Sequence, residues 1–130
     1  MIIADTDIMV DVLREYAPAI DWLGRIGDEQ ILVPGFVCAE LIQGCSDKSE
    51  QRKVLSFLSG YEVAWPEQGS CGRALDLFCD YYLSHGLGLI DALIAQTALD
   101  LAMPLHTFNA KHYQCVPGLE LVAPYARPRA

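Results

Sequence analysis

Short apolar runs alternate along the chain with segments in which apolar residues recur at helical spacing. The first run, Met1–Ala4, is continuous and precedes the polar Asp5-Thr6-Asp7, which favours a buried parallel strand that ends in a turn. The same kind of pattern predicts four more strands, at residues 31–33, 61–65, 105–107 and 119–122. Between the strands, helical spacing predicts helices at residues 8–13, 18–26, 36–42, 46–58, 74–82 and 90–101. This alternation predicts an α/β fold with a central, mainly parallel sheet of about five short strands flanked by helices.

The chain is expected to form a single domain over residues 1–130. Its length of 130 residues and its hydrophobic share of 52% allow one sizeable core and exclude an intrinsically disordered chain. The polar Asn109-Ala110-Lys111 predicts a turn, and the proline- and arginine-bearing residues 124–130 predict a loose C-terminal tail. We expect no membrane segment and no signal peptide, because no apolar run is long enough and no basic leader opens the chain.

Charge and cysteine content narrow the environment. Nine Lys and Arg residues against 17 Asp and Glu residues give a net charge of −8, so the chain as a whole has no electrostatic attraction to nucleic acid. Any contact with nucleic acid must use a metal, a basic partner or the few local cations, which are Arg52-Lys53, Lys111, Arg127 and Arg129. The five cysteines show no paired Cys-x-x-Cys spacing, which predicts reduced, packed thiols in a cytoplasmic protein rather than a zinc site.

Polar side chains are predicted to converge at the carboxyl edge of the sheet. Asp5 directly follows the first strand, and Asn109 comes two residues after the fourth. Asp91 begins the helix that leads down to the fourth strand, so it lies at the same edge. Glu40 is just over one turn into the helix that follows the second strand. In parallel α/β sheets, ligands bind at this edge.

Three carboxylates in one pocket repel one another unless a cation bridges them. Oxygen ligands favour Mg²⁺ or Mn²⁺, and such ions activate water and stabilise charge when a phosphodiester is cut. Each residue also has a purely structural interpretation. Asp5 could cap the first helix, Asp91 could complement a helix dipole, Glu40 could be solvated, and Asn109 could be a turn residue.

Four segments resemble, in order, the motifs of the PIN-domain family. They are Ile3-Ala4-Asp5-Thr6-Asp7-Ile8, Glu40-Leu41 with Gly44 after it, Asp91-Ala92-Leu93-Ile94-Ala95, and Thr107-Phe108-Asn109-Ala110-Lys111-His112-Tyr113. Their order and spacing are most similar to the VapC toxins of bacterial and archaeal type II toxin–antitoxin pairs. The resemblance covers nearly the whole chain.

The resemblance implies a Mg²⁺- or Mn²⁺-dependent endoribonuclease toxin that is inhibited by a small VapB-like antitoxin. It implies that Asp5, Glu40 and Asp91 are the acidic metal site and that Thr6 is the hydroxyl residue that often follows the first acid. Asn109 stands where other members have a fourth acid, so the number of bound ions stays open, as does a role for Asp7. Because few cations are available to hold RNA, we also expect the active form to be a homodimer.

Two other functions remain open from the sequence. An Asp5-Thr6-Asp7 turn after an apolar strand also resembles the first motif of haloacid dehalogenase-type phosphatases, for which Lys111 is the one well-placed lysine. A PIN-like fold with a weakened site, given Asn109, could instead be a binding module. A receiver domain fits poorly, because the third strand ends at Pro66-Glu67 rather than at an aspartate.

Overall fold

The computed structural model describes residues 1–127 of the chain. Its centre is one sheet of five strands in the order β3-β2-β1-β4-β5, and every neighbouring pair is parallel. The strands are β1 (Ile2–Ala4), β2 (Ile31–Pro34), β3 (Glu62–Ala64), β4 (Leu105–His106) and β5 (Leu121–Val122). The predicted α/β class and the five predicted strands are confirmed.

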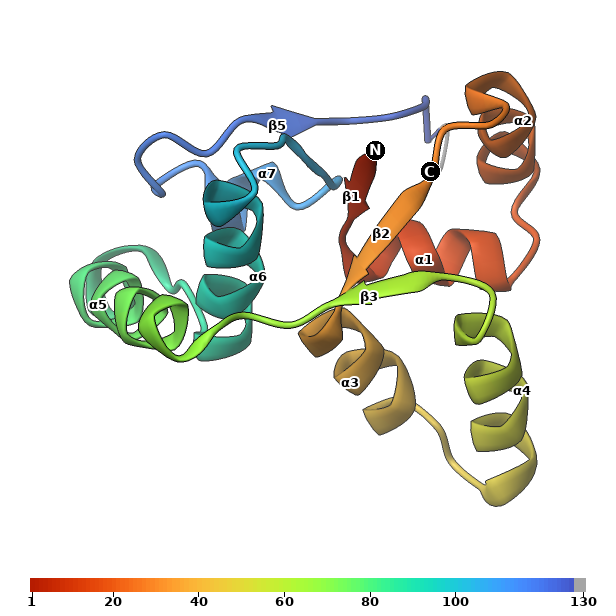
Figure 1. Cartoon of the computed structure of the whole chain (residues 1–130), viewed down its shortest axis with the longest axis horizontal. Helices are drawn as coiled ribbons and strands as arrows, with labels where there is room; N and C mark the ends of the chain where they lie inside the picture. The colour runs from red at the N-terminus through yellow and green to blue at the C-terminus, as the bar shows by residue number, and fades with distance from the viewer. Residues whose placement is uncertain (128–130) are drawn as a thin grey trace.

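Helices cover both faces of the sheet. They are α1 (Thr6–Leu13), α2 (Ala17–Ile26), α3 (Gly35–Gln43), α4 (Lys48–Leu58), α5 (Gln68–His85), α6 (Leu89–Asp100) and α7 (Ala110–Tyr113). Figure 1 shows α1 and α2 on one side of the sheet, and α5 and α6 on the other. Helices α3 and α4 extend beyond the carboxyl end of β2, so α3 stands at the edge where the polar residues were expected to meet.

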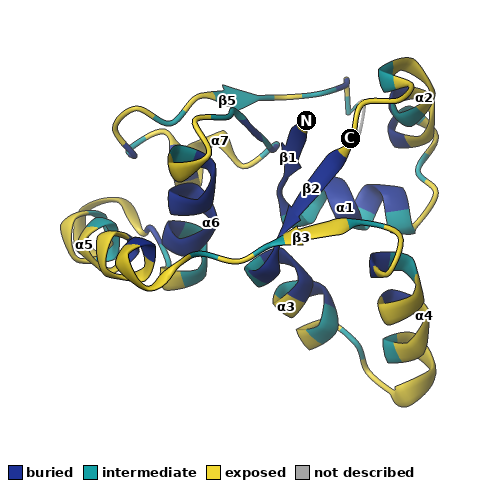
Figure 2. Cartoon of the chain, viewed as in Figure 1, coloured by how far each residue is buried: buried dark blue, intermediate teal, exposed yellow. Residues whose placement is uncertain are grey.

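The core lies where β1, β2 and α6 pack together. These are the darkest elements in Figure 2, and seven consecutive residues of α6, from Ala92 to Ala98, are buried. Helices α4 and α5 present mostly exposed surface in the same view. None of the helices within residues 1–127 is long and apolar enough to cross a membrane.

No loop separates β2 from α3, because the strand ends at Pro34 and the helix begins at Gly35. A side-chain carbon at Gly35 would overlap the ring of Trp65, which stacks edge-on against Phe36 with ring centres 5.5 Å apart. A glycine is therefore required where the two elements meet. This direct junction fixes where α3 begins and hence where Glu40 lies.

Two predicted boundaries differ from the structure. Helix α5 begins at Gln68 rather than near Ala74, because its first turns carry Gly69 and Gly72 and expose most of their residues, which removes the apolar signal. The short helix α7 occupies the segment after Asn109, where only a turn was predicted. It is anchored by Tyr113, whose side chain is buried.

The prediction of a loose tail from Pro124 is wrong for the described part of that segment. Tyr125 is only 8% exposed, and its ring packs against Trp22 and Phe108 at centre distances of 5.7 and 5.0 Å. Its hydroxyl donates to Asp11 Oδ2 at 2.8 Å. One aromatic residue therefore fastens the chain end to α1 and α2, while residues 128–130 lie outside the described part of the chain.

We expect Tyr125→Ala to lower the free energy of unfolding by about 3 kcal/mol, the usual cost of removing a buried aromatic side chain. Arg52→Ala is the control, because Arg52 is exposed on α4 and its truncation should change stability by no more than about 0.5 kcal/mol. Urea unfolding of the two variants measures the difference. Equal small effects would show that the segment around Tyr125 does not pack as described.

Candidate active site

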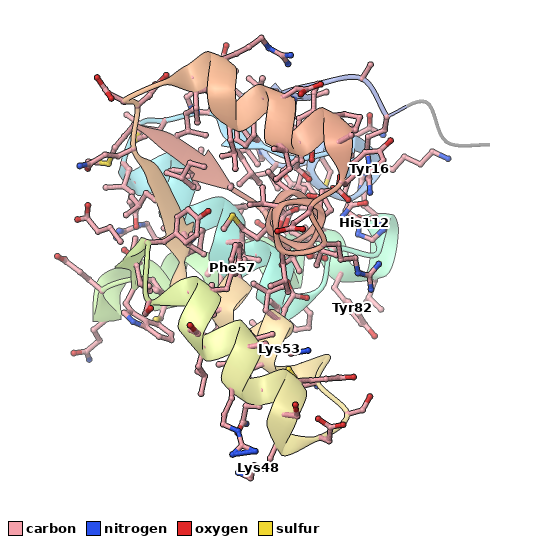
Figure 3. All side chains as sticks on the ribbon, turned by 90° about the vertical axis from the view of Figure 1, so that its right-hand side faces the viewer. Tyr16, Lys48, Lys53, Phe57, Tyr82 and His112 are labelled. Atoms are coloured by element: carbon pink, nitrogen blue, oxygen red, sulfur yellow. The ribbon has the colours of Figure 1, made fainter. Side chains whose placement is uncertain are left out.

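A cleft of about 510 Å³ opens at the carboxyl edge of the sheet. It brings together every site residue predicted from the sequence, namely Asp5, Thr6, Glu40, Asp91 and Asn109, and also Asp7, whose role the sequence left open. Asp11 and the basic side chains of Arg14, His112 and Arg127 also line it. Figure 3 shows His112 beside helix α1, which is seen end-on in that view. The predicted convergence of residues far apart in the sequence is therefore found in the structure.

Asp5 lies at the bottom of the cleft and is only 2% exposed. Its carboxylate accepts hydrogen bonds from the Thr6 amide and the Thr107 hydroxyl, both at 2.8 Å, and from the Tyr113 hydroxyl at 3.3 Å. Burial, followed by the nearby charge of Asp7, raises the pKa of Asp5 to about 7. The helix-capping interpretation and the pocket interpretation of Asp5 are therefore both correct.

Glu40 is held in place by Thr6. The Thr6 hydroxyl donates to Glu40 Oε1 at 2.6 Å, a short bond typical of a charged acceptor. The contact links the first turn of α1 to α3 across 34 positions of sequence. Thr6 therefore sets the direction of a carboxylate that would otherwise be free to rotate on its helix.

Asp91 has a structural and a site contact at once. Its Oδ2 accepts from the Gly88 amide at 3.3 Å, which caps the start of α6. Its Oδ1 faces the Tyr113 hydroxyl at 3.5 Å, and Nδ1 of His112 lies 3.8 Å from Oδ2. The phenol of Tyr113 thus stands between the carboxylates of Asp5 and Asp91 and bridges two acids that would otherwise repel each other.

Asp7 and Asn109 complete the acidic side of the cleft. Asp7 accepts hydrogen bonds from the amides of Ile8 and Phe108, at 2.9 and 2.8 Å, and burial raises its pKa. Asn109 precedes α7, and its backbone amide donates to the Thr107 hydroxyl at 3.0 Å. Its exposed side chain lines the cleft without any hydrogen bond that caps α7.

The donor set fits a hard divalent cation in kind. Asp5, Glu40 and Asp91 line one cleft with carboxylate groups, and such oxygens are the ligands that Mg²⁺ and Mn²⁺ prefer. Burial is the main cause of the raised pKa of Asp5, and a cation bound beside it would favour the charged carboxylate. Within residues 1–127, however, no three His, Cys, Asp or Glu side chains are already gathered to ligate a single ion. The three carboxylates therefore line the same cleft without forming a closed ligand set.

Three residues of the site were not recognised as functional from the sequence. Thr107 and Tyr113 both donate to Asp5, and both belong to the segment that carried the family resemblance, so their position was the available signal. Asp11 is buried beside the cleft. It follows Asp7 by four residues on α1, and this helical spacing places both on one face of the helix.

Known proteins are similar to this chain in fold and in sequence over almost its whole length. The PIN domain family model matches residues 2–115. Ribonuclease VapC10 of Mycobacterium tuberculosis is 34% identical over 134 aligned positions that cover all of both chains. Two solved structures match with a TM-score of 0.76. A toxin–antitoxin complex from Klebsiella pneumoniae is 24% identical over 98% of this chain and 100% of that chain. VapBC2 from Rickettsia felis, bound to a DNA fragment from its promoter, is 25% identical over 94% and 98%.

We expect Asp5→Asn to stabilise the metal-free protein by about 1 kcal/mol at pH about 8, because it removes a buried charge at nearly constant shape. The gain is limited, since the Asn amide faces groups that now donate to a carboxylate. Because folding raises the pKa of Asp5 to about 7, wild-type stability falls as the pH rises from the ordinary value of 3.8 through 7. The advantage of the variant should therefore shrink or reverse at pH about 5.

Thermal melts in EDTA at the two pH values measure this difference. Asp21→Asn, which removes an exposed carboxylate from α2, is the matched control and should leave the melting temperature unchanged at both. An Asp5→Asn variant that melts below wild type at both pH values would mean that Asp5 acts as a helix cap alone.

Proposed function

The chain belongs to the PIN domain family, and on this premise we propose that it is a divalent-metal-dependent endoribonuclease toxin inhibited by a cognate antitoxin. The carboxylate-lined cleft at the sheet edge is the observation that carries the proposal, because Asp5, Glu40 and Asp91 meet there from three separate elements. A relative of full length, 34% identical, is a ribonuclease of the VapC type. RNA is the proposed substrate, and Mg²⁺ or Mn²⁺ the proposed cofactor.

Asp5, Asp91 and Glu40 would hold the metal ion. When bound, the ion activates water and stabilises the negative charge that develops on a phosphodiester as it is cut. The remaining residues act on the carboxylates. Thr6 orients Glu40 through its hydroxyl. The hydroxyls of Thr107 and Tyr113 donate to Asp5 and fix its carboxylate. Each of these bonds holds an acid in position before any ion arrives.

Asn109 contributes a neutral oxygen where other family members have a fourth acid. An asparagine there lowers the negative charge of the cleft by one unit. Asp7, which also lines the cleft and raises the pKa of Asp5, adds one negative charge. We propose that the amide of Phe108, which donates to Asp7 at 2.8 Å, keeps Asp7 turned away from direct metal ligation. Asp7 would then tune the charge of the site rather than bind the ion.

A groove of about 400 Å³ next to the cleft is the proposed antitoxin site. It runs between α1, α3 and α4, and it shares Thr6, Val10, Arg14 and Glu40 with the cleft. Apolar side chains form much of its wall, including Leu13, Leu41 and Val54. A segment of the antitoxin laid in this groove could extend a basic side chain into the acidic cleft and block it. The two matched structures described as toxin–antitoxin and VapBC assemblies support a partner of this kind.

An apolar stripe on α5 is the proposed homodimer surface. Leu75, Tyr82 and Leu83 are 52, 51 and 92% exposed, and Leu89 at the start of α6 is 44% exposed. The spacing of Leu75, Tyr82 and Leu83 places them along one side of α5, with Cys71 one turn before Leu75 and Cys79 one turn after it. Figure 3 shows Tyr82 at the outer surface of the molecule. Exposed apolar side chains that gather in this way are typical of association surfaces.

All five cysteines are free thiols in the structure. Free thiols support the expectation of a reduced protein in the cytoplasm. Cytoplasmic location therefore stays a prediction, and it agrees with an RNA substrate and an antitoxin made in the same cell.

The phosphatase alternative has less support. Lys111, the lysine that such a mechanism would need, is exposed on α7 and is not among the described residues that line the cleft. Asp5 accepts three hydrogen bonds at the bottom of the cleft, which does not suit an attacking nucleophile. The binding-module alternative predicts a protein that does not cut RNA with either ion.

With Mg²⁺ or Mn²⁺ present, we expect the purified protein to cut single-stranded RNA, and EDTA to abolish the cleavage. Thr6→Val should lower the rate by about 10–100-fold, because it leaves Glu40 without its positioning bond. Thr97→Val is the matched control, since it is the same isosteric substitution and removes a hydroxyl that donates to the Leu93 carbonyl within α6. Electrophoresis of labelled RNA measures the rates.

Each contrary result points elsewhere. Cleavage that persists in EDTA would contradict the metal mechanism. Absence of cleavage with either ion would favour the binding module, and turnover of a phosphomonoester would favour the phosphatase.

The dimer proposal predicts that light scattering at micromolar concentration gives twice the chain mass. Leu83→Glu should weaken association by at least roughly tenfold, because it places a charge in the centre of the apolar stripe. Ile20→Glu is the control, since Ile20 is 40% exposed on the separate helix α2. A wild-type monomer, or equal effects of the two variants, would rule out this surface.

A further inference from the structure

The last described residues form a strap that crosses from the sheet to the rim of the cleft. The strap consists of residues 123–127, which follow β5. Tyr125 fastens it, with its ring between Trp22 and Phe108 and its hydroxyl 2.8 Å from Asp11 Oδ2. Two residues later, Arg127 lines the cleft together with the carboxylates of Asp5 and Asp91.

Two groups hold the guanidinium of Arg127. Its Nε lies 3.3 Å from Asp11 Oδ2 as an ion-pair contact, and its Nη2 donates to Asp11 Oδ1 at 3.4 Å. Its carbon stands 4.6 Å above the ring centre of Phe108. Asp11 is only 2% exposed, whereas the Arg127 side chain is 25% exposed. The arginine is therefore anchored from the protein side and still reaches solvent.

A guanidinium carries more N–H donors than one carboxylate can accept. The Nε and Nη2 edge faces Asp11, where Nη2 donates a hydrogen bond and the buried Nε lies at ion-pair distance without one. Within residues 1–127, Nη1 has no hydrogen-bond partner. The side chain thus keeps donors that can meet an anion in the cleft. The planar guanidinium matches the geometry of two phosphate oxygens. Because folding already orders the Arg127 side chain, RNA binding does not have to order it again.

The loop after β4 joins Arg127 to the carboxylate site. Phe108, whose ring supports the guanidinium, donates its amide to Asp7 at 2.8 Å. Thr107, the preceding residue, donates its hydroxyl to Asp5 at 2.8 Å. The position of Arg127 relative to Asp5 is therefore fixed through two adjacent residues of one loop.

We propose that Arg127 is a substrate-binding residue of the cleft, held by Asp11 and Phe108 so that it contacts a phosphate of the RNA strand beside the carboxylates. The inference rests on the proposed ribonuclease function and adds how the strand is held. It also answers the problem set by the net charge of −8, because an acidic protein must fix its few cations where the phosphates pass. Asp11 is the positioning residue, and Tyr125 fastens the strap.

The test measures RNA binding rather than turnover. A fluorescein-labelled single-stranded RNA of mixed sequence is titrated with the protein in Ca²⁺ over a range of KCl concentrations, and gels confirm that the RNA stays intact. Arg127→Gln should weaken binding by roughly tenfold at low salt and reduce the slope of log affinity against log salt by about 0.7, the value for one lost phosphate contact on a single strand. Arg127→Lys should keep the slope and lose affinity, since it retains charge but not the fork.

Arg25→Gln is the matched control, because it removes an exposed cation of α2 that does not line the cleft. It should leave both the affinity and the salt slope at the wild-type values. Equal slopes and affinities for Arg127→Gln and wild type would overturn the inference and make the strap purely structural. If the wild type cuts RNA in Mg²⁺ and the slopes are equal, only this inference fails. If the wild type neither cuts nor binds RNA, the inference and the proposed function fall together.

Discussion

Burial of the Asp5 carboxylate at the end of the central strand is the constraint on which the rest of the site depends. A buried charge is costly unless hydrogen bonds and charges compensate it. Here the compensating donors come from the start of α1, from Thr107 after β4 and from Tyr113 in α7, the last two more than 100 positions away. The fold must therefore bring β1, β4 and α7 together to satisfy one side chain, and in doing so it assembles the cleft.

The three aspartates at the start of α1 and along it differ in the groups that compensate their charges. Asp11 is paired with Arg127 and accepts from Tyr125, and Asp7 accepts two backbone amides. No Lys or Arg within residues 1–127 forms an ion pair with Asp5. Burial, followed by the charge of Asp7, raises the pKa of Asp5, and a divalent cation bound beside it would favour its charged form.

Much of this arrangement could be predicted from the sequence, for a physical reason. Parallel strands place their carboxyl ends at one edge, so Asp5, Glu40, Asp91 and Asn109 could be brought together from the alternation of strands and helices. The contacts of Tyr113 and Asp11 could not, because they depend on where α7 and the residues after Pro124 pack. A four-residue helix and a strap held by one tyrosine leave too little periodic pattern to be recognised. The anchoring of Arg127 was missed for the same reason.

The central claim is that a divalent ion binds in the cleft between Asp5 and Asp91. A crystal structure of the protein grown with Mn²⁺, with anomalous diffraction recorded at the manganese edge, tests it most directly. The account predicts one strong anomalous peak in the cleft, ligated by Asp5 and Asp91, with Glu40 within reach directly or through water. A peak elsewhere on the molecule, or no peak at a Mn²⁺ concentration that supports cleavage, would contradict it.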